Sequence, residues 1–96
     1  MITHTVLLTW KPGISTEQIA AIQQNLLALP AVITEIETYS CGSNVGPGET
    51  NADFAVVATF ASLADWRVYD THPEHTRVKT ELMLSWIATR SVIQFG

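Results

Sequence analysis

Four segments of the chain carry the residue pattern of short β-strands. Residues 2–10 are rich in β-branched residues and alternate between polar and apolar side chains, which is typical of a strand with one buried face. Residues 32–41, 53–60 and 87–95 are predicted as the other three strands. The polar, glycine-containing segment 42–51 then connects the second strand to the third as a hairpin loop.

Helix-start signals and helical spacing place a helix between the first two strands. Ser15-Thr-Glu-Gln18 is a capping box, in which the Ser15 hydroxyl accepts a hydrogen bond from the backbone N–H of Gln18 and the Gln18 amide reaches back. Apolar residues at helical spacing continue to about residue 29, where Pro30 ends the helix.

A second helical region fills the interval between the third and fourth strands and contains a break. Ser62 and Asp65 mark its start, and the helix reaches residue 69 or 70. Pro73 suits the first turn of a further helix, capped by Thr71 or His72, which extends to about residue 84. The order strand–helix–strand therefore occurs twice.

This order of elements predicts the fold. Right-handed crossovers would give a four-stranded antiparallel sheet with the helices on one face, which is the ferredoxin-like α+β arrangement. A chain of 96 residues is long enough for one hydrophobic core but not for two, so we expect a single domain over residues 1–96.

The two faces of the predicted sheet differ in a way that indicates a partner. Two helices cannot cover both faces of a sheet, and an uncharged open face favours cover by another chain. We therefore expect a homodimer that pairs sheet against sheet about a two-fold axis. The first and third strands place His4, Val6, Leu8, Phe54, Val56, Ala58 and Phe60 on the helix side, and Thr3, Thr5, Leu7, Thr9, Ala55, Val57 and Thr59, none of them charged, on the open side.

Composition narrows the range of other partners. Hydrophobic residues make up 47% of the chain and charged residues 15%, which favours a globular protein over a disordered one. A net charge of −4 would repel a phosphate backbone, so no nucleic acid partner is expected. The longest apolar run falls far short of the ~20 residues of a membrane helix, so no membrane partner is expected. A lone Cys41 and the absence of a signal-peptide pattern favour a cytoplasmic location.

The segment from Tyr69 to His75 carries the residues best suited to proton exchange. It contains two of the three histidines, and the third, His4, lies on the helix-facing side of the first strand. Tyr69 falls on the buried side of its helix, and His75 shares a helix face with Leu82. We therefore expect His4, Tyr69 and His75 to approach one cavity between the sheet and the helices, with His72 outside it as a helix-start residue.

Other kinds of site receive little support from the sequence. His72 and His75 have an i,i+3 spacing that can supply two ligands, but zinc needs three or four, so no metal is expected. No serine sits on a glycine-flanked turn and the glycines of 42–48 do not open a helix, so neither a hydrolase triad nor a phosphate-binding cofactor site is expected. The alternative to a functional pocket is structural, because buried histidines and tyrosines also form satisfied, hydrogen-bonded clusters in protein cores.

Motifs along essentially the whole chain resemble those of the stress-responsive A/B barrel (Dabb) family. The resemblance implies ferredoxin-like chains that dimerise through their sheets into an α+β barrel. A plant polyketide cyclase of this family carries out an intramolecular aldol condensation without a cofactor, and its pocket residues match His4, Tyr69 and His75. The motifs are His4-Thr-Val-Leu-Leu-Thr-Trp-Lys11, Leu29-Pro-Ala-Val32, Asp53-Phe-Ala-Val-Val-Ala-Thr-Phe60 and Tyr69-Asp-Thr-His-Pro-Glu-His75.

Two functions follow from the residues and the resemblance together. In the first, the protein is a homodimeric stress-responsive or small-ligand-binding protein with a polar His/Tyr pocket. In the second, it is a cofactor-free enzyme that moves a proton on a small carbonyl compound. His75 would then be the general acid or base, Tyr69 would donate to a developing oxyanion or hold the imidazole, and His4 would position the substrate.

Overall fold

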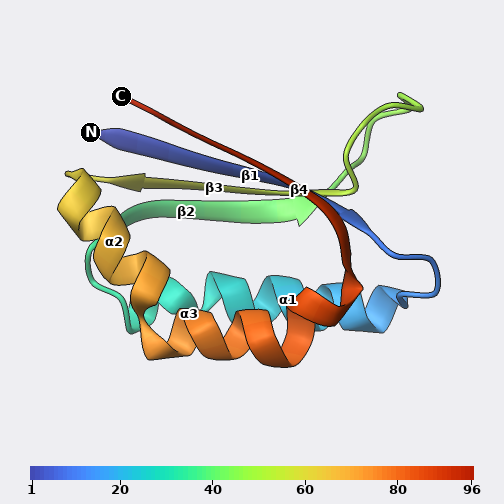
Figure 1. Ribbon diagram of the computed structural model, residues 1–96, viewed down its shortest axis with the longest axis horizontal. Helices are drawn as coiled ribbons and strands as arrows, with labels where there is room; N and C mark the ends of the chain where they lie inside the picture. The colour runs from blue at the N-terminus through green and yellow to red at the C-terminus, as the bar shows by residue number, and fades with distance from the viewer.

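The computed structural model describes residues 1–96 as a two-layer α+β structure. Its four strands form one antiparallel sheet in the order β2-β3-β1-β4 (Figure 1), which confirms the predicted ferredoxin-like fold. The elements are β1 (Ile2–Trp10), α1 (Thr16–Leu27), the 3-10 turn η1 (Leu29–Ala31), β2 (Ile36–Ser43), β3 (Phe54–Phe60), α2 (Leu63–Thr71), α3 (Pro73–Val78), the π-helical η2 (Lys79–Met83), the 3-10 turn η3 (Leu84–Trp86) and β4 (Ile87–Phe95).

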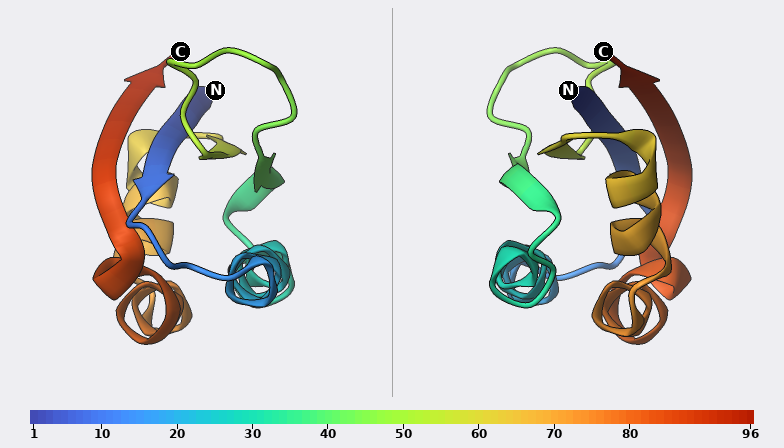
Figure 2. Two further views of the ribbon diagram at one scale, coloured as in Figure 1. Left: turned by 90° about the vertical axis from the view of Figure 1, so that its right-hand side faces the viewer. Right: turned by 90° about the vertical axis from the view of Figure 1, so that its left-hand side faces the viewer.

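All helices lie on one face of the curved sheet, and the other face carries no helix (Figure 2). The hydrophobic core fills the space between the two layers, because the alternation of each strand directs its larger apolar side chains toward the helices. The largest fully buried side chains of the core come from both layers and are Leu8, Ile22, Leu26, Leu29, Ile33, Phe54, Phe60 and Val78.

The strand register determines which polar residues reach the helix side. In the centre of the sheet, His4 lies between Ala58 of β3 and Gln94 of β4. Two pairs further along the same face, Leu8 lies beside Arg90 of β4. Gln94 and Arg90 therefore face the helices together with His4, although β4 is an edge strand.

The predicted helix starts are confirmed in atomic detail. Both hydrogen bonds of the capping box are present: the N–H of Gln18 donates to the Ser15 hydroxyl at 3.0 Å, and the N–H of Ser15 donates to Gln18 Oε1 at 2.8 Å. The Ser62 hydroxyl likewise accepts from the N–H of Asp65 at 3.2 Å and begins α2. These local bonds fix where each helix enters from its strand.

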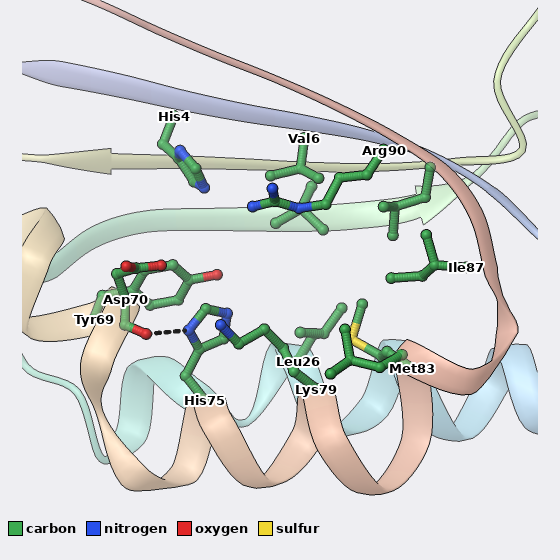
Figure 3. A pocket seen from close by; sticks show the side chains of 13 residues that line it. His4, Val6, Leu26, Tyr69, Asp70, His75, Lys79, Met83, Ile87 and Arg90 are labelled. Carbon is green, nitrogen blue, oxygen red and sulfur yellow. Dashed lines mark hydrogen bonds between the residues drawn. The ribbon is translucent and has the colours of Figure 1, made fainter.

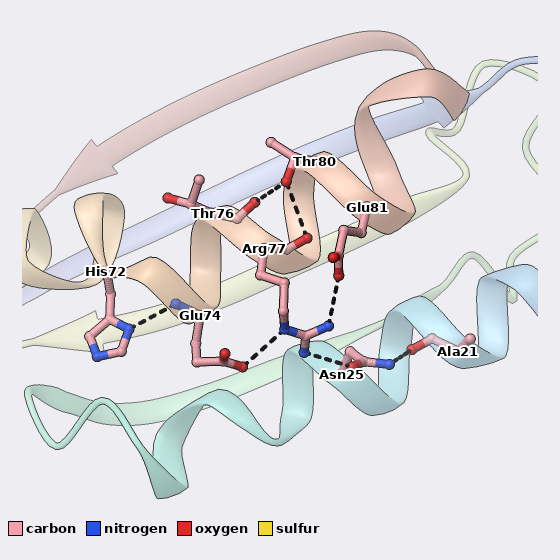
Figure 4. Close-up of polar contacts among 8 residues, drawn as sticks. All are labelled: Ala21, Asn25, His72, Glu74, Thr76, Arg77, Thr80 and Glu81. Atoms are coloured by element: carbon pink, nitrogen blue, oxygen red, sulfur yellow. Dashed lines mark hydrogen bonds and ion pairs between the residues drawn. The ribbon is translucent and has the colours of Figure 1, made fainter.

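The break between α2 and α3 is built by His72 and Pro73. A residue before proline avoids the helical conformation, and His72 is extended, with φ −63° and ψ 137°. Its Nδ1 accepts from the N–H of Glu74 at 3.1 Å (Figure 4), so His72, not Thr71, is the cap. In a continuous helix that N–H would donate to the carbonyl of Asp70. The break therefore leaves the Asp70 carbonyl free for another donor.

The predicted helix over residues 73–84 is continuous in space but not in hydrogen bonding. After Val78 the chain becomes π-helical, and the N–H of Leu84 donates to the carbonyl of Lys79, five residues back. A 3-10 turn then leads into β4. No helix of the chain combines the length and the apolar character required to cross a membrane.

The second strand begins later than predicted, at Ile36 and not at residue 32. Val32 and Ile33 are β-branched and favour a strand by propensity, but here tertiary packing decides. Ile33 is fully buried in the core, and its N–H donates to the carbonyl of Leu29 at 2.8 Å, which prolongs the helical turn at Pro30.

Arg77 links the two long helical segments. Its Nη2 donates to Asn25 Oδ1 of α1 at 3.2 Å, and its Nε and Nη1 bind Glu74 and Glu81, each at 3.2 Å (Figure 4). Each of these exposed ion pairs contributes little to stability by itself. Together with Asn25 they set the orientation of α3 against α1, and α3 carries His75.

The paired residues of the open face are uncharged on all four strands, as the sequence predicts for two of them, and the exposed Glu37 lies at the register shift of β2 between Ile36 and Thr38. Several of its apolar side chains are exposed in the isolated chain, with Leu7 at 44%, Ile93 at 61% and Phe95 at 58%. From β2 to β4 the face consists of Thr38, Ser40, Gly42, Ala55, Val57, Thr59, Thr3, Thr5, Leu7, Thr9, Thr89, Ser91, Ile93 and Phe95.

Replacing His72 by alanine should destabilise the protein by about 0.5–2 kcal/mol, because the N–H of Glu74 loses its capping acceptor. His72→Asn is the matched control, since an asparagine side chain can accept the same bond and should keep most of the stability. Urea unfolding of the three proteins measures the difference. Equal losses in both variants would contradict the capping role.

Candidate functional site

A cavity of about 60 Å³ lies between the sheet and the helices, on the side of β4 (Figure 3). A single buried water needs about 10–15 Å³ by this kind of measure, so the space accommodates more than one water or a small organic molecule. Its inner wall is formed by buried side chains such as Leu8, Leu26 and Val56, while Leu84 and Arg90 at the rim are exposed. The cavity therefore opens between β4 and the end of the α3–η2 helix.

His4, Tyr69 and His75 all line this cavity, and His72 does not. Their side chains come from β1, α2 and α3, and only 4%, 2% and 7% of their respective surfaces is exposed. The structure therefore brings the three predicted residues together as expected. Their role in binding or catalysis stays a prediction.

His75 has a defined hydrogen-bonding direction. Its Nδ1 lies 3.3 Å from the backbone carbonyl of Asp70, the group that the break at Pro73 leaves without an N–H partner. A carbonyl only accepts, so Nδ1 carries the proton and donates, and Nε2 keeps its lone pair. The ring stacks on Tyr69 with centroids 4.1 Å apart, which holds the Nε2 edge toward the cavity (Figure 3).

In His4 the two ring nitrogens have the opposite hydrogen-bonding roles to those of His75. The side-chain amide of Gln94 donates to His4 Nδ1 at 3.2 Å, so the remaining ring proton is on Nε2. The ring projects from the sheet toward the helices and lies edge-on to Tyr69, at 6.1 Å between centroids (Figure 3). One imidazole therefore presents a donor, and that of His75 presents an acceptor, to the same space.

The buried phenol of Tyr69 forms a hydrogen bond with a second tyrosine. Its hydroxyl lies 3.0 Å from the hydroxyl of Tyr39 on β2, and either oxygen can be the donor. When Tyr39 donates, the O–H of Tyr69 is free to donate to another group. The phenol can thus act as a donor without leaving an unpaired buried atom behind.

Burial disfavours the charged forms of these groups. It is the main cause that lowers the pKa of His75 to about 4, and the nearby charge of Lys79 lowers it further. Burial also lowers the pKa of His4, with Arg90 as the second cause. It raises the pKa of Tyr69 to about 12. Two neutral imidazoles and a protonated phenol can exchange or share protons with a ligand, but they cannot pair with a charge as ions.

The arrangement does not resemble a metal centre. No three side chains among His, Cys, Asp and Glu lie together in a way that could hold a metal ion. His72 uses Nδ1 for the cap of α3, and His75 uses Nδ1 for the Asp70 carbonyl. Both rings keep Nε2 available, but His75 lines the cavity and His72 does not, so the i,i+3 pair of the sequence does not converge on this cavity.

Sequence reasoning missed five polar residues around the pocket. Tyr39, Gln94, Asp70, Lys79 and Arg90 all contact the three central side chains or line the cavity. Alternation along the fourth strand was the one available signal, because it places Arg90 and Gln94 on the same side of the sheet. Tyr39 comes from an edge strand distant in sequence, and nothing in its own neighbourhood pointed to the pocket.

Comparison with known proteins agrees with the fold and with the motifs. Residues 2–96 match the family model of the stress-responsive A/B barrel domain. A crystal structure of a dimeric ferredoxin-like protein of unknown function from Thermobifida fusca YX is 32% identical, with a TM-score of 0.90 over 99% of this chain and 89% of the other. A dimeric protein of unknown function with a ferredoxin-like fold from Bacteroides fragilis NCTC 9343 is 26% identical, with a TM-score of 0.84 over 98% and 93% of the two chains.

A third solved structure, the hydroxynitrile lyase from Passiflora edulis, shares the fold at 21% identity, with a TM-score of 0.84 over 98% of this chain and 90% of the other. At this identity the likeness concerns the fold alone. A search of curated proteins found no match.

The depressed pKa of His75 predicts a loss of stability in mild acid. The unfolded chain takes up a proton near the ordinary histidine pKa of 6.5, whereas the folded chain resists it until about 4. Between pH 7 and pH 5 the free energy of unfolding should therefore fall by about 2 kcal/mol from this residue. Urea unfolding at several pH values measures the slope.

His75→Gln should remove most of that slope, because the glutamine amide can still donate to the Asp70 carbonyl but does not titrate. His72→Asn, outside the cavity, is the control and should keep the slope. A wild-type stability that stays constant over this range would show that His75 is not held neutral.

Proposed function

The chain belongs to the stress-responsive A/B barrel family, and on this basis we propose that it is a homodimeric stress-responsive or small-ligand-binding protein. In this proposal the ligand occupies the cavity lined by His4, Tyr69 and His75. A cytoplasmic location is part of the same proposal, and it is supported by Cys41, which has no second cysteine in the chain to pair with.

One observation carries the ligand-binding proposal: the cavity holds a hydrogen-bond donor and a hydrogen-bond acceptor with fixed directions. His4 offers Nε2–H and His75 offers the lone pair of Nε2, because Gln94 and the Asp70 carbonyl occupy their Nδ1 atoms. A purely structural cluster would direct these atoms at each other or at the backbone. Here they border an open volume of about 60 Å³ with a largely apolar wall, which is the usual composition of a small-molecule site.

Dimerisation through the open sheet face is the second part of the proposal. The solved neighbours from Thermobifida fusca and Bacteroides fragilis are dimeric, and this supports a homodimer here. The apolar side chains of the open face support the sheet as its interface, since Leu7, Ile93 and Phe95 would otherwise remain exposed to water. Pairing two such faces would close the two sheets into an α+β barrel and leave the helix-side cavity of each protomer open.

Cofactor-free proton transfer on a small carbonyl compound is the second candidate function. Its specific support is the free lone pair of His75 Nε2, which would take a proton from the carbon beside a carbonyl. The resulting enolate oxygen would accept from His4 Nε2–H or from the O–H of Tyr69. The hydroxynitrile lyase with this fold is an example of such a scaffold with catalytic activity, although its likeness to this chain extends only to the fold.

Introducing a charge into the open face should dissociate the dimer. Leu7→Lys would bury an unpaired ammonium at the interface, so the dimer dissociation constant should rise by about 100-fold or more. Leu27→Lys is a matched control, because Leu27 is exposed to 46%, close to the 44% of Leu7, but lies on α1. Sedimentation or light scattering over a range of concentrations measures both. A wild-type monomer, or a dimer insensitive to Leu7→Lys, would refute the interface.

Removing the His75 imidazole distinguishes a role in ligand binding from a role in folding stability. Acetylacetone and acetoacetate serve as small carbonyl probes, and wild-type protein should bind at least one of them with shifts in the His4 and His75 NMR signals. His75→Gln should weaken that binding about tenfold or more, whereas His72→Asn should not. A stability loss of about 1–3 kcal/mol in His75→Gln with unchanged binding would assign the group to a structural cluster instead.

The proposed catalytic activity can be tested separately by hydrogen–deuterium exchange of a small ketone. In deuterated water, wild-type protein should accelerate the exchange of the methyl protons of acetone, and His75→Gln should abolish the acceleration, because the base that removes the proton is gone. Exchange at the buffer rate in the wild type would remove the enzymatic candidate and leave the binding proposal in place.

A further inference from the structure

The rim of the cavity holds an excess of positive charge. The chain has five lysines and arginines, and two of them, Lys79 and Arg90, line this cavity. Neither takes part in an ion pair, since both ion pairs of the protein belong to Arg77. Lys79 and Arg90 thus place two cations without an ion-pair partner at one opening of a chain with a net charge of −4, where a partner of opposite charge from outside the chain can pair with them.

The two cations approach the cavity from opposite walls. Arg90 belongs to β4, and its position beside Leu8 in the register directs it to the helix side. Figure 3 shows its guanidinium extended over the cavity below Val6, while the ammonium of Lys79 lies beside the His75 ring on the helix side. The charge of Arg90 lowers the pKa of His4 and that of Lys79 lowers the pKa of His75, which agrees with this placement.

The charges at the site also define the charge of the partner. Asp70 is the only acidic side chain among the lining residues, and it acts on the pKa of both His4 and His75 in the direction opposite to the two cations. Because the imidazoles are neutral, one positive charge remains in excess. A partner with a single negative charge balances it, whereas a phosphate dianion would be repelled by Asp70 and would leave an excess of negative charge.

We propose that the ligand of this pocket is a small monocarboxylate that also carries a ketone. The carboxylate would lie at the rim between Arg90 and Lys79, and the ketone oxygen would accept from His4 Nε2–H further inside. The carbon between the two groups would then face His75 Nε2, and the remaining alkyl group would contact the apolar wall at Leu26 and Met83. This inference rests on the proposed ligand-binding function and adds the class of ligand to it.

The chemistry of the two cations favours a carboxylate in particular. The guanidinium fork of Arg90 matches the planar geometry of a carboxylate in a bidentate contact, and charge-assisted hydrogen bonds are about twice as strong as neutral ones. The ammonium of Lys79 adds a point charge without a geometric demand. A neutral diketone of the same size would gain none of these contacts and would leave both cations unpaired.

Acetoacetate and acetylacetone test the inference as a matched pair of probes. They have the same number of non-hydrogen atoms and differ by the exchange of a methyl group for a carboxylate oxygen. Wild-type protein should bind acetoacetate about tenfold or more tightly than acetylacetone in NMR titrations. Arg90→Gln and Lys79→Gln should each reduce that preference about tenfold, and added salt should weaken only the binding of acetoacetate.

Arg67→Gln is the control, because Arg67 is an exposed arginine of α2 outside the cavity, and its loss should leave both affinities unchanged. Melting temperatures confirm that each variant folds. Equal binding of the two probes, both lost in His75→Gln, would overturn the carboxylate proposal and leave the ligand pocket standing. Absence of binding by both probes would overturn both proposals, and inorganic phosphate binding more tightly than acetoacetate would overturn the assignment to a monocarboxylate.

Discussion

The position of one carbonyl group controls the chemistry of the pocket. Pro73 forces His72 out of the helix, and the His72 ring then takes the N–H that would otherwise have bonded to the carbonyl of Asp70. The free carbonyl accepts from His75 Nδ1 and thereby decides which ring nitrogen of His75 keeps a lone pair. A backbone break, a cap and an imidazole tautomer are thus consequences of one proline. The tautomer also requires that the ring stay neutral, which burial ensures.

Features that depend on neighbouring residues were predictable from the sequence. The capping box at Ser15, the break at Pro73 and the alternation that faces His4 toward the helices are all local, and each is found. The family resemblance depended on the same motifs. Its fold is found in the structure, and the three residues that it implied for a pocket, His4, Tyr69 and His75, line a single cavity.

Features that depend on contacts between distant segments were not predictable. The hydroxyl of Tyr39 reaches Tyr69 across the core, and this pairing follows from the register of an edge strand that itself begins later than its propensities suggest. Ile33 explains the late start of this strand, because a β-branched residue can be buried in a turn as well as in a strand. The π-helical turn over Lys79–Met83 pairs the N–H of Leu84 with the carbonyl of Lys79, five residues back, and no residue pattern announces such a change of hydrogen bonding.

The edge position of β4 has a consequence for the proton position on His4. β4 is hydrogen-bonded only to β1; it supplies Ile87 and Arg90 to one wall of the cavity, and its Gln94 bonds to His4. An element anchored on one side is the part of a sheet that opens locally at the lowest free energy. Fraying of β4 from its C-terminal end would withdraw the amide of Gln94 from His4, whereas Arg90, nearer the start of the strand, would keep its place at the rim. The proton position on His4 therefore depends on the pairing of an edge strand with β1.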